Sequence, residues 1–156
     1  MRSLRIVVAD DEPITRIDVK KMLTELGHQV VGEARNGAMA LELVQKLRPD
    51  LVILDVRMAK MDGIKAAKLI TGQKLCAVLL LTAYSEEEVL NRALDAGIMG
   101  YLTKPVAKKE LEPSLRIAWV RYQDLMALKH KKLELIGARD RDIRREKIKN
   151  TGGAVS

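Results

Sequence analysis

Short apolar runs alternate with helix-like segments along the first 120 residues of the chain. Runs of this length, bounded by turn residues, are typical of β-strands. The run at residues 77–81 is apolar throughout, as expected for a strand that is covered on both faces. The predicted strands comprise residues 4–9, 29–34, 51–54, 77–81 and 100–103.

Helix signals fill the gaps between these predicted strands. Pro13 suits the first turn of a helix, and Gly27 provides a stop for it. Asn36 can cap a second helix, and Ser85 with Glu88 forms a capping box for a later one. The sum is an α/β chain of the (βα)₅ type. Because crossover connections are right-handed, it predicts a doubly wound parallel sheet.

The last predicted helix is unusually long. It begins near Lys108 and contains no breaker other than Pro113, in its first turn, before Gly137. About 29 residues of helix would run about 43 Å. Its apolar stripe needs a partner, and a second helix in a coiled coil would supply one, so a homodimer through this helix is predicted. A helix that packs back on its own domain remains the alternative. The stripe comprises Trp119, Tyr122, Met126, Leu133 and Ile136, with Lys129 at a seam position.

The tail beyond Gly137 is rich in charge, with small residues at its end. Such a composition favours a frayed helix or disorder. The predicted organisation is therefore a globular domain at residues 1–120, a helical extension at 121–137, and a basic, disordered tail at 138–156. Residues 121–156 hold 10 of the 28 Lys and Arg but only 5 of the 21 Asp and Glu. This excess predicts only weak, non-specific binding to nucleic acid.

Composition bounds the setting of the protein. With 47% apolar residues, 156 residues can form one domain with a core and an appendage. Cys76 is the single cysteine, which excludes an intrachain disulfide and favours a buried thiol. No apolar run is long enough for a signal segment or for the ~20 residues of a membrane span, so we expect no membrane partner and a cytoplasmic location.

Candidate chemistry lies just after the predicted strands. Asp10 and Asp11 follow the first, Asp55 follows the third, and Lys104-Pro105 follows the fifth. The carboxyl ends of parallel strands meet at one edge of a sheet, where such folds bind ligands. Three clustered carboxylates repel one another, so a bound divalent cation is the natural compensation. A carboxylate beside a cation and a lysine is a plausible acceptor of a phosphoryl group.

These residues resemble the receiver domain of two-component response regulators, over residues 4 to about 120. The elements that carry the resemblance are Asp10-Asp11-Glu12, Asp55, Asp62-Gly63, Thr82-Ala83, Tyr101 and Lys104-Pro105. The resemblance implies a flavodoxin-like receiver fold and a signalling switch, not an enzyme. It also implies that a sensor histidine kinase is the partner that supplies the phosphoryl group.

The resemblance assigns roles to the site residues. Asp55 would be the phosphoacceptor. Asp11, Asp55 and the backbone carbonyl of Arg57 would hold Mg²⁺, with Asp10 acting through water. Mg²⁺ prefers oxygen ligands and keeps several waters, which suits this set. The chain departs from the commonest receiver pattern at Arg57 and Ala59, but only the backbone carbonyl of Arg57 is needed for metal binding.

The remaining elements would form the switch. Lys104 would neutralise the phosphoryl group as a point charge. Thr82, followed by Ala83, would offer its hydroxyl to a phosphoryl oxygen, and Tyr101 would swing between exposed and buried rotamers as Thr82 moves. The Lys104–Pro105 bond is a candidate for the cis form, which X-Pro bonds tolerate and which would aim the lysine inward.

A narrower resemblance concerns output. Segments 11–16, 31–34 and 111–118 resemble regulators that carry a C-terminal RNA-binding antitermination (ANTAR) domain. In that subfamily the last receiver helix extends into a coiled coil before a three-helix RNA-binding unit. The 19 residues after Gly137 are too few, and of the wrong composition, for such a unit. A truncated antitermination regulator and a stand-alone phosphorelay receiver are therefore both open as alternatives.

Three other classes are compatible with parts of the pattern. A phosphatase of the haloacid-dehalogenase type also uses a strand-end aspartate, but it needs a second aspartate where Arg57 stands. A nucleic-acid-binding protein would show a reading helix or an aromatic platform, and none is visible. A flavodoxin-like cofactor carrier would need glycine and hydroxyls where Asp10, Asp11 and Glu12 stand.

Overall fold

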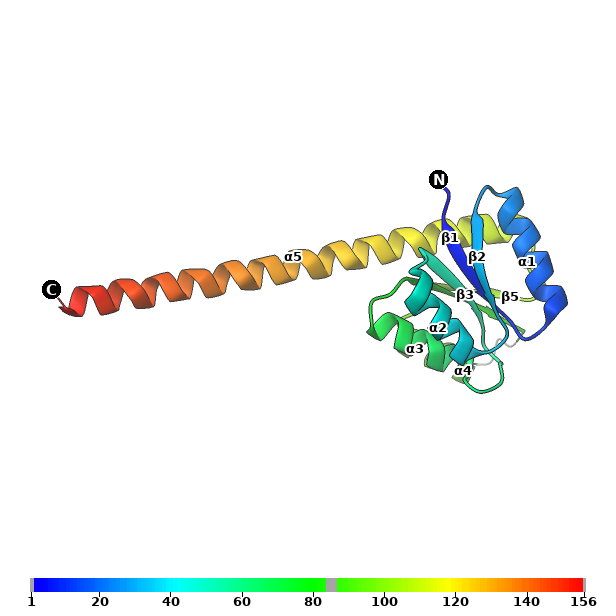
Figure 1. Cartoon of the computed structure of the whole chain (residues 1–156), viewed down its shortest axis with the longest axis horizontal. Helices are drawn as coiled ribbons and strands as arrows, with labels where there is room; N and C mark the ends of the chain where they lie inside the picture. The colour runs from blue at the N-terminus through cyan, green and yellow to red at the C-terminus, as the bar shows by residue number, and fades with distance from the viewer. Residues whose placement is uncertain (1, 84–86, 156) are drawn as a thin grey trace. The chain divides into compact units, whose positions relative to one another are not determined.

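The computed structural model describes residues 2–83 and 87–155, with side chains up to residue 148. Five strands alternate with five helices in the described residues (Figure 1). Residues 1–122 form one compact unit and residues 123–156 a second. The elements are β1 (Arg5–Ala9), α1 (Pro13–Glu25), β2 (Gln29–Ala34), α2 (Gly37–Leu47), β3 (Leu51–Asp55), α3 (Gly63–Gly72), β4 (Ala77–Thr82), α4 (Glu87–Asp95), β5 (Gly100–Thr103) and α5 (Lys108–Val155).

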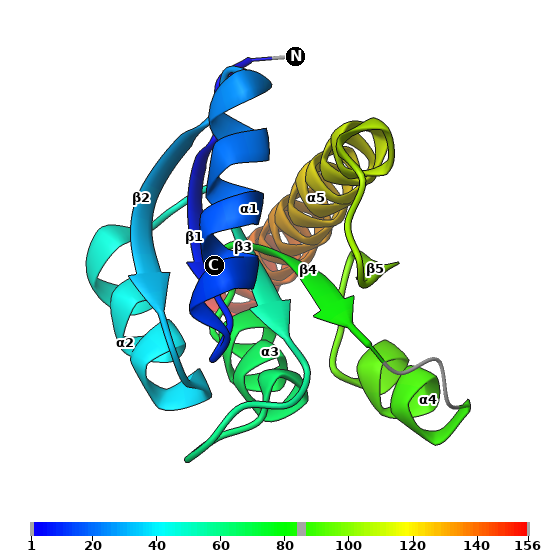
Figure 2. The ribbon, with the colours of Figure 1, turned by 90° about the vertical axis from the view of Figure 1, so that its right-hand side faces the viewer.

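The strands of the first unit form a single parallel sheet. Their order is β2-β1-β3-β4-β5, as Figure 2 shows, and every neighbouring pair is parallel. The order reverses direction beside β1, where the chain crosses from β2 to β3, so a topological switch point lies between β1 and β3. The predicted doubly wound (βα)₅ fold is confirmed.

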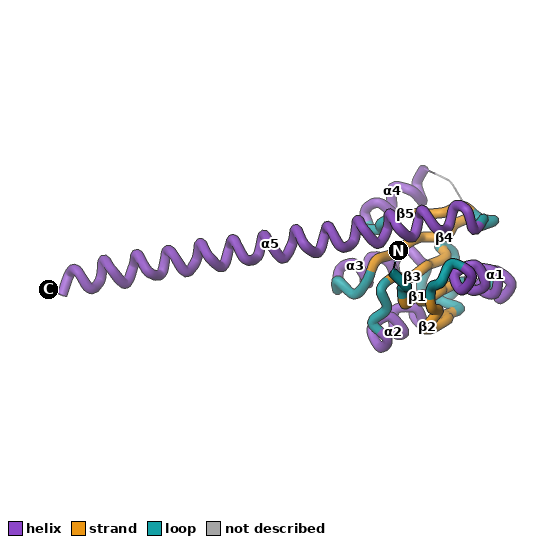
Figure 3. Tube along the Cα trace, turned by 90° about the horizontal axis from the view of Figure 1, so that it is seen from above, coloured by secondary structure: helices purple, strands orange, loops and turns teal. Residues whose placement is uncertain are grey.

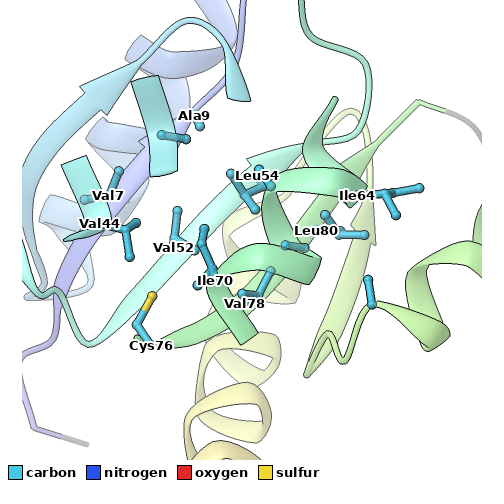
Figure 4. Packing of buried hydrophobic residues seen from close by; sticks show 14 of the residues in the cluster. Val7, Ala9, Val44, Val52, Leu54, Ile64, Ile70, Cys76, Val78 and Leu80 are labelled. Atoms are coloured by element: carbon cyan, nitrogen blue, oxygen red, sulfur yellow. The ribbon is translucent and has the colours of Figure 1, made fainter. Parts of the chain in front are cut away.

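Two apolar layers cover the two faces of the sheet. Because successive strand residues point to opposite faces, Val7 belongs to one layer while Ile6 and Val8 belong to the other. The first layer packs α2, α3 and α4 on the sheet, and Figure 4 shows some of its side chains, among them Val52 and Val78, gathered between the strands and these helices. The second layer packs α1 and the start of α5. The central strands β3 and β4 are buried along their whole length, which confirms the expectation for the apolar run at residues 77–81.

Local signals place the helix starts. Pro13 begins α1, and the side chain of Asn36 accepts a hydrogen bond from the backbone N–H of Met39 at 2.8 Å. Asp62 caps α3 in the same way, through the N–H of Lys65. Both caps satisfy amide groups that the first turn of a helix leaves without partners. The predicted capping box at Ser85 lies outside the described residues.

The last helix differs from the prediction. It was expected to stop at Gly137 and to give way to a frayed helix or a disordered tail, but α5 continues to Val155, as the uninterrupted coil in Figure 3 shows. The expected stop is wrong because one glycine inside a helix costs only about 1 kcal/mol relative to alanine. A glycine ends a helix when the backbone turns left-handed there, and Gly137 has no positive φ.

Two residues of the predicted partner stripe pack within the first unit. Trp119 and Tyr122 are half-buried beside the α1 and α5 layer. The guanidinium of Arg2 lies 4.9 Å from the centre of the Trp119 ring, and the Tyr122 hydroxyl donates to the carbonyl of Lys74 at 3.3 Å. These two side chains therefore belong to the domain, and the exposed stripe begins after them. No helix in the part of the chain that the structure describes is long and apolar enough to cross a membrane.

Candidate functional site

The strand ends bring the candidate residues to one edge of the sheet. Asp10 directly follows β1, Asp55 is the last residue of β3, and Lys104 directly follows β5. The register pairs Ala9 with Leu54, so the ends of β1 and β3 lie side by side at the switch point. The backbone N–H of Asp10 donates to Ala34 O at 3.0 Å, which extends the β1–β2 ladder and holds the carboxylate at this edge.

Three carboxylates form an acidic cluster there, consisting of Asp10, Asp11 and Asp55. One oxygen from each lies within 4.8 Å of the others. Asp10 is fully buried and Asp55 is only 6% exposed, whereas Asp11 is exposed to solvent. Burial of two like charges at this distance is unfavourable, so the cluster stores electrostatic repulsion that a cation can relieve.

Lys104 lies against the acidic cluster. Its ammonium nitrogen lies 2.7 Å from Asp10 Oδ2 and 3.4 Å from Asp55 Oδ1, and its side chain is 14% exposed. It also approaches Glu12 Oε1 at 3.3 Å. The backbone N–H of Lys104 donates to Thr82 O at 2.8 Å, so the end of β4 positions the lysine. The Lys104–Pro105 peptide bond is cis, as its sequence allowed.

The surroundings of Asp55 make its carboxyl hard to ionise. Burial, and next the negative charge of Asp10, raise the pKa of Asp55 from 3.8 to about 6, although the attraction of Lys104 acts in the opposite direction. Burial by itself would lower the pKa of Lys104, but the carboxylates of Asp10, Asp55 and Glu12 outweigh it and raise that pKa. Near neutral pH the site therefore holds an ionised, high-energy carboxylate beside a firmly charged lysine.

The acidic cluster fits a hard divalent cation. One ammonium cannot neutralise three carboxylates, and Asp10 Oδ2 makes its ion pair with Lys104 but no directed hydrogen bond within the described residues. A buried oxygen left in this state is costly. Mg²⁺ takes carboxylate oxygens as ligands and keeps waters in its remaining positions, which suits a cluster with one member open to solvent.

The other predicted site residues lie on the strands and loops around the acidic cluster. Thr82 ends β4 and is buried, with Thr103 beside it in register, and Ala83 follows it at the surface. Arg57 lies in the loop after β3 with its side chain exposed. Tyr101 lies on the edge strand β5 and is half-exposed, in register with Leu80. The structure thus brings Asp10, Asp11, Asp55 and Lys104 together, while Tyr101 stands apart on its strand.

Three contacts were not assigned by the sequence analysis. Glu12 shares Lys104 with the two buried aspartates. The guanidinium of Arg16 donates to the carbonyl of Asp10 at 2.6 Å and anchors the start of the loop. A Cβ at Gly63 would collide with the carbonyl oxygen of Asp55, so only glycine lets α3 approach β3 this closely. Glu12 and Gly63 had been noted only as parts of motifs.

Comparison with known proteins agrees with this geometry. Residues 6–116 match the family described as the response regulator receiver domain. The chain belongs to this receiver family. Receiver domains bind Mg²⁺ at an acidic pocket, partner with sensor histidine kinases, and generally act as signalling modules rather than enzymes.

Individual relatives and solved structures show which receivers the chain is similar to. The chain is 42% identical over 124 residues to the transcriptional regulatory protein PdtaR of Mycobacterium tuberculosis, covering 80% of this chain and 60% of the relative. The chain therefore spans less than two thirds of the length of that protein. The receiver domain of NarL from the same organism superposes with a TM-score of 0.71 at 38% identity, covering 76% of this chain and 98% of that domain. The response regulator domain of Thermotoga maritima CheB gives a TM-score of 0.70 at 29% identity, covering 76% and 97%.

Proposed function

We propose that this receiver is switched by phosphorylation of Asp55. The observation that carries the proposal is the position of Asp55, buried at the end of β3 between a second carboxylate and the ammonium of Lys104. With a pKa of about 6, its carboxyl is ionised at neutral pH yet poorly stabilised. Such a carboxylate is a nucleophile that gains from forming a bond to an electrophile.

In the proposed reaction, an Asp55 oxygen attacks the phosphorus of a phosphohistidine on the partner kinase. The new O–P bond forms as the N–P bond breaks, and the electron pair leaves with the imidazole. Lys104 faces the incoming phosphoryl oxygens as a point charge. Asp11, Asp55 and the backbone carbonyl of Arg57 would hold Mg²⁺, with Asp10 acting through water, and the ion would neutralise charge on the transferred group.

The switch would follow from the exchange of contacts around Lys104. Its backbone is bonded to the carbonyl of Thr82, so a shift of the lysine toward a phosphoryl oxygen pulls on the end of β4. The Thr82 hydroxyl and the adjoining Ala83 would then approach the same group, and Tyr101 on the neighbouring strand would change rotamer. A buried end of β4 beside an exposed edge strand transmits a local charge change to the surface.

Intact-mass measurement with a small phosphodonor tests the acceptor. We expect one phosphoryl adduct on the full chain with Mg²⁺ and none with a chelator, because the cluster must be neutralised before an anion approaches. Asp55→Asn should carry no adduct. Asp62→Asn is the matched control, since Asp62 caps α3 and pairs with Arg92 instead of joining the cluster. An unchanged adduct on Asp55→Asn would rule out the assignment.

We also propose that the exposed part of α5 mediates self-association. Leu133, Ile136 and Ile143 are large apolar side chains that remain 61%, 48% and 46% exposed. Burial of such side chains gives about 25 cal/mol per Å² before the cost of association. The output carried by this receiver is proposed to concern transcription, as the name of PdtaR supports for that relative. Direct nucleic-acid binding by residues 121–156 is proposed to be weak and blind to sequence.

A further inference from the structure

The exposed face of α5 carries a mixed seam of apolar and charged residues. Within the second unit, α5 is the only element among the described residues, so no other part of that unit covers the face. Positions that alternate by four and three residues share one side of a helix. In the second unit, which begins at Gln123, this seam comprises Met126, Lys129, Leu133, Ile136, Asp140 and Ile143.

The charged members decide how two copies could pair. In a parallel coiled coil each seam residue meets its own copy in the same layer. Lys129 would then face a second lysine, and Asp140 would face a second aspartate. Like charges placed directly opposite each other at a desolvated seam are strongly disfavoured. The parallel arrangement therefore meets repulsion at both of its charged layers.

An antiparallel arrangement converts both charged layers into opposite-charge pairs. When Leu133 faces the partner's Ile136, Met126 faces the partner's Ile143, and Lys129 faces the partner's Asp140. The two-fold symmetry repeats each pair, so every layer joins apolar to apolar or cation to anion. We propose that two copies of this chain associate through α5 as an antiparallel coiled coil in this register. The proposal rests on the self-association proposed above and specifies its geometry.

Registers shifted by one heptad, and the residues that flank the seam, do not favour a different arrangement. A slip by one heptad places Lys129 opposite either Leu133 or Lys147 of the partner, which loses the opposite-charge layer. At the flanking positions, Lys132 approaches Arg139 in the antiparallel pair, and Arg139 approaches Arg144 in the parallel pair. Each orientation thus brings together one pair of basic residues beside the seam, and such exposed pairs contribute little to the free energy of association. The seam charges alone distinguish the orientations.

Charge reversal on the full chain tests the pairing. Sedimentation should show that Lys129→Asp and Asp140→Lys each raise the dimer dissociation constant at least about tenfold. The double variant should restore most of the wild-type affinity, because it rebuilds the pair with the signs exchanged. Lys131→Asp is the matched control, since the same change falls on the opposite side of the helix and should leave the dimer intact. Circular dichroism checks that helix content is unchanged in each variant. Failure of the double variant to recover would overturn the register.

Thiol cross-linking gives an independent readout of orientation. In the proposed dimer, Met126 lies about 25 Å along the helix axis from its own copy but in one layer with Ile143 of the partner. Under an added thiol oxidant such as oxidised glutathione, a Met126→Cys chain mixed with an Ile143→Cys chain should therefore form a mixed disulfide. Met126→Cys alone should not cross-link with itself under the same conditions. The native Cys76 is buried, which raises the pKa of its thiol to about 12, so it does not interfere.

The outcomes separate this inference from the proposals it rests on. Cross-linking of Met126→Cys with itself would show a parallel dimer and overturn the geometry while leaving self-association standing. A dimer that is insensitive to the seam but lost in Leu128→Ala or Leu135→Ala would move the interface to another face and also overturn it. A monomer at all accessible concentrations would overturn both self-association and the inference. None of these results bears on phosphorylation of Asp55.

Discussion

Replacement of Asp55 by asparagine should stabilise the metal-free fold. The folded protein holds the Asp55 carboxyl at a pKa of about 6 instead of 3.8, because burial and the charge of Asp10 penalise the ionised form. Each pKa unit corresponds to about 1.4 kcal/mol, so the ionised carboxylate costs up to about 3 kcal/mol at neutral pH. Asparagine keeps the shape and removes the charge. Since Lys104 also loses a partner, we expect a net gain of about 1–3 kcal/mol in the free energy of unfolding.

The sign of the pH dependence identifies the cause. A carboxyl with a raised folded pKa binds protons more tightly in the folded state than in the unfolded state. Wild-type stability should therefore fall, on account of this group, as pH rises from about 4 to about 6, and should stay lowered above that. The advantage of Asp55→Asn over wild type should be full at pH 7.5 and should shrink as pH falls through this window.

Urea unfolding in a chelator at several pH values measures this difference. Asp62→Asn is the control, because it sits in the next loop outside the acidic cluster and should show no such gain. Added Mg²⁺ should reverse the order, since a ligand at 1,000 times its dissociation constant adds about 4.1 kcal/mol to the protein that binds it, which exceeds the expected gain. If Asp55→Asn were less stable than wild type at pH 7.5 in chelator, or if its gain did not vary with pH, electrostatic repulsion would not be the dominant force at this site.

Other parts of the chain allow further tests. Gly63→Ala should destabilise the fold by about 2–3 kcal/mol in urea unfolding, because its Cβ would collide with the Asp55 carbonyl, whereas Gly72→Ala, which meets nothing within 4 Å, should be neutral or stabilising. Burial, and next the positive charge of the N-terminus, lower the pKa of His28. The free energy of unfolding that depends on His28 should therefore be at its full value above pH 6.5 and should decrease as the pH falls below 6.5. An imidazole NMR titration with a midpoint at or above 6.5 would contradict this. Residues 121–156 should bind a hairpin RNA and a scrambled control equally, with dissociation constants near 10⁻⁴–10⁻⁶ M at physiological salt that weaken steeply as salt rises. Tight binding that discriminates the two RNAs at physiological salt would show a specific reader.

The strand ends could be predicted from sequence because two simple regularities agree there. Apolar runs mark the strands, and parallel strands must present their carboxyl ends on one edge. Asp10, Asp55 and Lys104 each come at the end of such a run, so their convergence followed without knowledge of side-chain rotamers. The structure confirms that convergence with direct ion pairs.

The contacts of long or flexible groups could not be predicted in the same way. Glu12 and Arg16 reach the site through side chains with several rotatable bonds. Glu12 contacts Lys104, which is far away in sequence, and Arg16 contacts a backbone carbonyl, that of Asp10, whose orientation the sequence does not reveal. The need for glycine at position 63 depends on how closely α3 approaches β3, which is a property of packing and not of local sequence. The periodicity of apolar residues predicts a helix or strand and which of its faces is buried, but it does not predict how closely that element approaches the neighbouring one.

The last helix shows the same limit most clearly. Leu111, Leu115 and Ala118 face the sheet and are buried. Traced back from Leu133, the alternation of four and three residues passes through Met126 and Trp119 and reaches Leu115. One continuous stripe therefore serves first as domain core and then as exposed seam. Sequence alone located the stripe but could not tell where its covering changes, and so Trp119 was assigned to the exposed part although Arg2 covers it.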